Sequence, residues 1–235
     1  MLHSIANKRY NGKRLYVDYV QPEPSPYPSA YQYLEFTYND VTAYNALVNA
    51  INERGFSAVD SGSNLMCLIP NETTAVSFGY VGEYNHFYGC KDWFLPYVTD
   101  TTALFEWSPL TSIPDNFWGL SATKNLGRAF NCLHTQNAGL TEVKSFDGLV
   151  NVETFDYAFY ENKYPMTFPT AFAQNTFQNC SSFWRCFTKV TANNEMVPFA
   201  QHCNNVCPSS LSGDRKWTYL TAAPDLIEFR ALDWY

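Results

Sequence analysis

The sequence predicts an α+β protein, in which a small β-α-β-β module precedes a short, irregular solenoid of strand–turn–short-helix repeats. One helical pattern of apolar residues lies between strand-like stretches over residues 30–70. A fixed spacing of apolar residues recurs three times after residue 110, with a period near 28 residues. Hydrophobic residues make up 46% of the chain and aromatic residues 17%, which is ample material for a core.

Residues 1–29 are predicted to be an arm followed by a proline-rich linker. The end of the arm, KRLYVDYV, alternates as a short strand does. The linker at 21–29, QPEPSPYPS, has four prolines in nine residues, which is typical of a stiff extended spacer. We expect the arm to dock the protein to a larger assembly. The candidate anchor residues are Lys8, Arg9, Lys13, Arg14 and Tyr16.

Residues 30–107 are predicted to form the small α+β domain. Tyr31–Tyr38 has the pattern of a strand. Asn39 or Asp40 can cap the helix that follows, because a short side-chain acceptor satisfies free amides of the first turn. Five apolar residues at helical spacing indicate that helix: Val41, Tyr44, Leu47, Val48 and Ile51.

The end of this helix and two further strands are also indicated. Gly55 fits the position just past the helix, where a left-handed backbone is needed. Phe56–Val59 and Leu65–Ile69 have the character of short strands around the turn DSGS. The loop DSGSN lacks the glycine spacing and the lysine of a phosphate-binding loop, which argues against a nucleotide site. For residues 71–107 we expect short strands and loops.

The chain becomes self-similar from Leu110 onward, and residues 108–204 are predicted to be the repeat domain. Four apolar positions recur with offsets of 6, 3 and 1 residues, which predicts one face of a short helix in each copy. Such a unit cannot bury its apolar side alone, so neighbouring copies are expected to stack over a shared core. The copies are Leu120, Leu126, Ala129 and Phe130; Leu149, Phe155, Ala158 and Phe159; and Phe177, Phe183, Cys186 and Phe187.

The strings AFNC, AFYEN and NCSSFWRCF, with the intervening LTEVKSFDGLVNVETF, resemble the BspA-like leucine-rich-repeat family over about residues 110–200. The resemblance implies a leucine-rich-repeat-like solenoid with short parallel strands on one face and short helices on the other. It also implies a surface, adhesion or phage protein without catalytic residues. The leucines of the family are largely replaced here by Phe, Val and Met. Residues 205–235 are predicted to cap the last repeat, because its core would otherwise be exposed.

Charge and hydropathy argue against several classes of protein. The formal net charge is −7 and no basic stripe is present, so binding to nucleic acid is not expected. The chain contains no run of about 18 apolar residues, so no membrane span is expected. The amino-terminal residues lack the apolar region and cleavage site of a signal peptide.

Seven cysteines stand at positions 67, 90, 132, 180, 186, 203 and 207. Because the count is odd and no signal peptide is recognised, buried free thiols are the preferred interpretation. The best metal candidate combines His202, Cys203 and Cys207 with Cys132 and His134. Its second pair is about 70 residues away, so we expect no metal and no cofactor.

Two disulfides stay open as alternatives for an oxidising medium, Cys203–Cys207 and Cys180–Cys186. None of the four histidines, at positions 3, 86, 134 and 202, lies in a catalytic sequence frame. The spacing of Asp225 and Glu228 permits a carboxylate pair, although solvated carboxylates are the more common case. The protein is therefore expected not to be an enzyme.

The candidate binding residues are large aromatic side chains and one arginine, since tyrosine and tryptophan are favoured in recognition surfaces. They are Trp107, Trp118, Tyr157, Trp184 and Arg185. The competing interpretation is that these aromatic residues pack between repeats.

These observations together predict a non-enzymatic structural or binding protein. The preferred context is a bacteriophage virion, as a capsid decoration, head fibre or tail appendage. The expected partners are other virion or surface proteins at the arm and a host glycan or protein at the repeats, within a homo- or hetero-oligomeric assembly. The alternatives are an adhesin of the leucine-rich-repeat type on a bacterial cell surface and, third, a carbohydrate-active enzyme.

Overall fold

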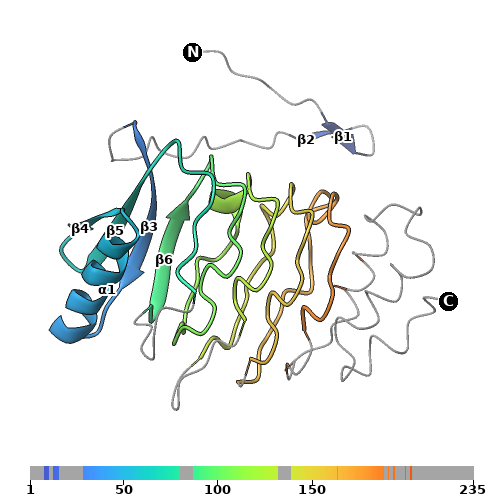
Figure 1. Ribbon diagram of the computed structural model, residues 1–235. Helices are drawn as coiled ribbons and strands as arrows, with labels where there is room; N and C mark the ends of the chain where they lie inside the picture. Colours follow the sequence, from blue (N-terminus) through green and yellow to red (C-terminus); the bar gives the residue numbers. More distant parts are fainter. Residues whose placement is uncertain are drawn as a thin grey trace.

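The computed structural model is a mixed α+β structure with one antiparallel four-stranded sheet and one α-helix among the residues that it describes. Those residues are 8–10, 13–15, 29–79, 87–131, 139–162 and 164–187, with Val190, Asn193, Phe199 and His202. Figure 1 shows the sheet and the helix at one end of a row of chain segments that lie side by side. The predicted α+β class is confirmed at this level. The predicted domain boundaries stay predictions.

The four-stranded sheet has the strand order β4-β5-β3-β6, with every neighbouring pair antiparallel. Its strands are β3 (Tyr31–Thr37), β4 (Ser57–Asp60), β5 (Asn64–Pro70) and β6 (Gly89–Phe94). The other elements are α1 (Val41–Glu53), the 3₁₀ helix η1 (Trp118–Leu120) and a separate two-stranded sheet of β1 (Lys8–Tyr10) and β2 (Lys13–Leu15). The predicted order β-α-β-β over residues 31–70 is therefore confirmed.

Local sequence signals fix the ends of α1 as expected. The side chain of Asp40 accepts a hydrogen bond from the backbone N–H of Ala43 at 2.8 Å, which caps the helix. Gly55 has a positive φ of 77° just past the last turn. Ala43, Leu47 and Ile51 are buried. Val41 was wrongly expected on this face and is 71% exposed, because it is the first residue of the helix.

The core of the sheet continues into the rest of the molecule as one hydrophobic cluster. Leu34 and Phe36 of β3 are fully buried and face Cys67 and Leu65 of β5 in the register of the two strands. The buried side chain of Gln32 joins the sheet to the next part of the chain. Its Nε2 donates to the carbonyl oxygens of Pro70 and Thr73, and its Oε1 accepts from the N–H of Tyr97. A buried amide is tolerated here because its donors and acceptor are satisfied.

After the sheet, successive parts of the chain are joined by parallel β-bridges. One row of bridges links residues 75 to 100, 100 to 125, 125 to 154 and 154 to 182. A second row contains the bridges Gly89–Ser112 and Glu142–Thr167. We call residues 100–107, 125–131, 154–161 and 182–187 the stacked segments 1 to 4. In the first row the bridged residues are 25 to 29 positions apart, so each segment lies beside the equivalent part of the next copy.

In the four stacked segments the residues that follow the bridged position form turns, so the short helices predicted there are wrong. In segment 2 the N–H groups of Leu126, Arg128 and Phe130 donate to carbonyl oxygens of segment 3, at 2.8–3.0 Å. The same alternation joins segment 1 to segment 2 and segment 3 to segment 4. An α-helix would bond these N–H groups within its own turn, whereas here every second one is used between segments.

Phenylalanines at equivalent positions form a continuous ladder through the four segments. The rings of Phe105, Phe130, Phe159 and Phe187 are buried, with successive centroids 6.1, 5.1 and 5.9 Å apart. Segment 1 therefore belongs to the same pattern, with Leu95, Thr101 and Leu104 at the other three positions. The position before each phenylalanine is small in the last three segments, where it is Ala129, Ala158 and Cys186.

Replacing Cys186 with alanine is expected to lower the free energy of unfolding by about 1 kcal/mol or less. The side chain of Cys186 is fully buried, but alanine already occupies the equivalent position in segments 2 and 3. Denaturant-induced unfolding measures the change. A loss above about 3 kcal/mol, in the range of a large core truncation, would contradict a purely packing role for this side chain.

Candidate recognition surface

The third residue after each bridge has a left-handed backbone in all four stacked segments. The φ angles of Ala103, Arg128, Tyr157 and Arg185 lie between 54° and 57°. This conformation costs about 1–2 kcal/mol for a residue with a side chain, so it is uncommon for arginine and tyrosine. The N–H groups of the first three donate to the next segment at 2.8–2.9 Å. The stacking of the segments therefore sets this geometry, whichever side chain is present.

Short polar side chains hold the turns just before these residues. The Oδ1 of Asn125 accepts from the N–H of Gly127 at 3.0 Å, and Asp100 accepts from Thr102 in the same way at 2.9 Å. In segment 4 the acceptor is Asp156 of the preceding segment, which binds the N–H of Trp184 at 2.7 Å. Hydrogen bonds therefore fix the backbone on both sides of the left-handed positions.

The side chains at and near these positions form one cluster on segments 2 to 4. The guanidinium of Arg128 lies 5.4 Å from the ring centroid of Tyr157, and that of Arg185 lies 5.4 Å from the ring of Trp184. Tyr157 contacts the rings of Trp184 and Tyr160, each at 5.2 Å. We call these five residues the cation–aromatic platform. Trp184 is 44% exposed, and both arginines are exposed.

The structure brings together three of the five predicted binding residues, Tyr157, Trp184 and Arg185. Trp107 and Trp118 are also about half exposed. Trp107, however, belongs to segment 1, three segments before Trp184, and Trp118 begins η1 and makes no ring contact with another described residue.

Two residues of the platform, Arg128 and Tyr160, were missed by the sequence reasoning. The signal for Arg128 was present, because it precedes Ala129 just as Tyr157 precedes Ala158. The signal for Tyr160 was also present, because it directly follows Phe159, one of the phenylalanines of the ladder.

The two arginines differ in whether a carboxylate lies close to the guanidinium. Arg128 lies 3.8 Å from the carboxylate of Glu106, which also accepts a hydrogen bond from Asn131 at 2.7 Å. The Glu106 side chain is only 11% exposed and so lies below the surface. Arg185 makes no ion pair with any residue that the structure describes. Its charge is therefore available to a partner.

The candidate anchor residues lie partly within the described chain. Lys8 and Arg9 belong to β1, and Lys13 and Arg14 belong to β2, with Arg9 opposite Arg14 in the antiparallel register. Tyr16 and the linker at 21–28 lie outside the described residues. The strand expected near the end of the arm is thus found only for Lys13–Leu15 within the described chain.

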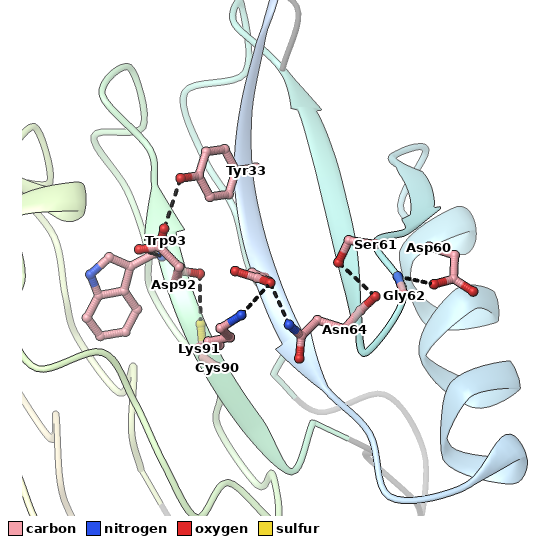
Figure 2. Close-up of polar contacts among 10 residues, drawn as sticks. Tyr33, Asp60, Ser61, Gly62, Asn64, Cys90, Lys91, Asp92 and Trp93 are labelled. Carbon is pink, nitrogen blue, oxygen red and sulfur yellow. Dashed lines mark hydrogen bonds and ion pairs between the residues drawn. The ribbon is translucent and has the colours of Figure 1, made fainter. Parts of the chain in front are cut away.

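A second group of polar residues joins strands of the four-stranded sheet (Figure 2). The carboxylate of Glu35 pairs with Lys91 at 3.1 Å and accepts from the amide of Asn64 at 2.7 Å. The hydroxyl of Tyr33 donates to Asp92 at 2.9 Å, as Figure 2 shows. Because each carboxylate contacts a residue of at least one neighbouring strand, the arrangement acts to hold the strands in register.

Within the part of the chain that the structure describes, no three histidine, cysteine or acidic side chains gather as a metal ion would require. The ring of His202 stacks on Phe172, and its Nε2 lies 2.7 Å from the carbonyl oxygen of Thr176. Cys186 is a buried free cysteine, so it is not joined to Cys180. The other residues weighed for metal binding, disulfides or catalysis lie outside the described chain, namely His3, His86, Cys132, His134, Cys203, Cys207, Asp225 and Glu228.

The buried thiols of Cys67, Cys90 and Cys186 are expected not to react with iodoacetamide in the native protein. Burial raises the pKa of the thiols of Cys67, Cys90 and Cys186, so each is protonated at neutral pH and shielded from solvent. Peptide mass spectrometry after alkylation measures this, with the denatured protein as the control in which all three react. Rapid modification of Cys186 in the native protein would disagree with the packing described above.

No protein-family model, curated protein or solved structure matches this chain. Among the described residues, the helices are too short or too polar to cross a membrane.

Proposed function

We propose that this protein is a non-enzymatic binding protein, in which a short leucine-rich-repeat-like solenoid presents the cation–aromatic platform to a partner. One observation carries the proposal. Equivalent positions of three successive segments display Arg128, Tyr157 and Arg185 side by side, on a backbone fixed by hydrogen bonds between the segments. The buried phenylalanine ladder beneath them supports the same interpretation, because it gives the surface a rigid base.

Such a platform suits recognition for a physical reason. Tyrosine and tryptophan offer large contact areas and lose little side-chain entropy on binding. Neighbouring arginines and backbone hydrogen bonds already restrict their positions, which lowers the ordering cost further. Burial raises the pKa of the thiols of Cys67, Cys90 and Cys186, so these three cysteines supply no reactive thiolate at neutral pH.

The test is binding of the fluorescently labelled full-length protein to whole bacterial cells. We expect Trp184→Ala together with Arg185→Ala to abolish most of the binding, whereas Trp118→Ala leaves it unchanged. Trp118 is a matched control because it is an exposed tryptophan, at 52%, outside the platform. Equal binding by the wild type and the double variant would rule out the platform as the recognition surface.

The biological context is a separate part of the proposal. We place the protein on a bacteriophage particle, with the arm at residues 1–29 as its anchor, and a bacterial surface adhesin is the alternative. Mass spectrometry of purified particles and fractionation of cells separate the two locations. Shortening of a polysaccharide by the purified protein, measured by size-exclusion chromatography, would instead support a carbohydrate-active enzyme.

A further inference from the structure

We propose that the cation–aromatic platform binds a linear acidic polysaccharide with its acidic groups on alternate sugars, laid across segments 2 to 4. This inference rests on the proposed binding function and adds the chemical class of the partner. It follows from the charge of the platform, the spacing of its two arginines and the aromatic rings between them.

The platform presents two exposed cations on an acidic protein, and the carboxylate of Asp156 beside it is bound to the N–H of Trp184. The chain carries a formal net charge of −7, yet Arg128 and Arg185 are both exposed on this one surface. Arg185 has no ion-pair partner among the described residues, and the carboxylate nearest to Arg128 is the largely buried Glu106. A guanidinium presents a planar fork of donors that matches a carboxylate or sulfate. Charge complementarity therefore favours an anionic partner.

The spacing of the arginines selects among anionic polymers. Arg128 and Arg185 occupy equivalent positions in segments 2 and 4, with Tyr157 of segment 3 between them. Hydrogen-bonded neighbours of this kind are about 4.8 Å apart, so the two arginine positions are separated by about 9.6 Å. Two sugars of an extended pyranose chain cover a similar length, which places an acidic group near each arginine.

An acidic peptide fits this spacing less well. In an extended peptide, side chains on the same face repeat about every 6.8 Å, which matches the spacing of the two arginine positions less closely than two sugars do.

The aromatic rings supply contacts for the sugar between the two acidic groups. The rings of Tyr157 and Trp184 contact each other, each ring also contacts one of the two guanidiniums, and Trp184 remains 44% exposed. The apolar C–H face of a pyranose packs on an aromatic ring, whereas its hydroxyl groups stay hydrated. A neutral sugar flanked by two acidic groups therefore matches the order arginine, aromatic ring, arginine.

The experiment is isothermal titration calorimetry of the full-length protein with hyaluronan oligosaccharides, which carry a carboxylate on alternate sugars. We expect binding that weakens as salt is added, because exposed charges are screened. Arg128→Ala, Arg185→Ala and Trp184→Ala are each expected to weaken it about tenfold or more, in line with the loss of a hydrogen bond to a charged group or of an aromatic contact. Lys144→Ala and Trp118→Ala are matched controls with no expected effect, since Lys144 pairs with Asp115 in another part of the chain.

Other probes define the results that would overturn the proposal. Equal affinity for neutral dextran would show that the acidic groups of the polysaccharide do not contribute to binding. Tighter binding of polyglutamate or oligothymidylate would assign the platform to a peptide or a nucleic acid. Arg185→Gly is a second variant that removes the guanidinium without straining the backbone, because glycine tolerates the φ of 54° at this position. Weaker binding by this variant would therefore not be due to misfolding. If cell binding depends on the platform but no acidic polysaccharide binds, this inference fails and the proposed function stands.

Discussion

Phe159→Ala is expected to lower the free energy of unfolding by about 3–5 kcal/mol, the range seen when a large core aromatic is truncated. The Phe159 ring is fully buried and stacks between Phe130 and Phe187, with centroid distances of 5.1 and 5.9 Å and interplanar angles of 14° and 13°. The Phe159 ring also makes an edge-to-face contact with Phe168, which directly follows the bridged residue Thr167 of the second row. Truncation therefore opens a cavity that adjoins three stacked segments at once.

Denaturant-induced unfolding, followed by circular dichroism, measures this effect. Trp118→Ala is the matched control, because it removes a larger aromatic side chain from an exposed position and should change stability by about 0.5 kcal/mol or less. If the two variants lost the same stability, the phenylalanine ladder could not be the main support of the stacked segments.

The ladder also explains why part of the fold could be predicted from the sequence. The offsets of 6, 3 and 1 correctly identified the buried positions, such as Leu126, Phe130 and Phe159. The same offsets were wrongly assigned to short helices. A left-handed residue within a turn, such as Arg128 or Tyr157, brings buried positions to one side without helical hydrogen bonds. The spacing alone cannot distinguish these cases, because the N–H groups donate to carbonyls that lie more than 20 residues away.

Features that depend on a few neighbouring residues were predicted best. The cap at Asp40 and the left-handed Gly55 follow from interactions within one turn of α1. Segment 1 was missed because Thr101 stands where later copies have leucine or phenylalanine. Among the candidate binding residues, the grouping of Tyr157 with Trp184 depends on how segments 3 and 4 stack, which only the structure reveals.

Gly148→Ala is expected to destabilise the protein by about 3 kcal/mol or more, since it combines backbone strain with a steric clash. Gly148 has a φ of 104°, and an added Cβ would lie 2.3 Å from the backbone carbonyl carbon of Phe117 and the nitrogen of Trp118. Those atoms cannot easily move away, because the N–H of Phe117 donates to the carbonyl oxygen of Asp147 at 2.7 Å. Relief of the clash would therefore break a contact between two neighbouring parts of the stack.

Gly62→Ala separates the two causes. Gly62 also has a positive φ, at 92°, but no atom lies within 4 Å of its added Cβ. The free energy of unfolding of this variant should fall only by the cost of backbone strain, about 1–3 kcal/mol. Thermal and denaturant unfolding of both variants measure the difference, which isolates the contribution of the close approach at Gly148. Equal losses of unfolding free energy for Gly148→Ala and Gly62→Ala would mean that the backbone at Phe117 moves to accommodate the added methyl group. The packing between residues 117 and 148 would then be looser than the structure indicates.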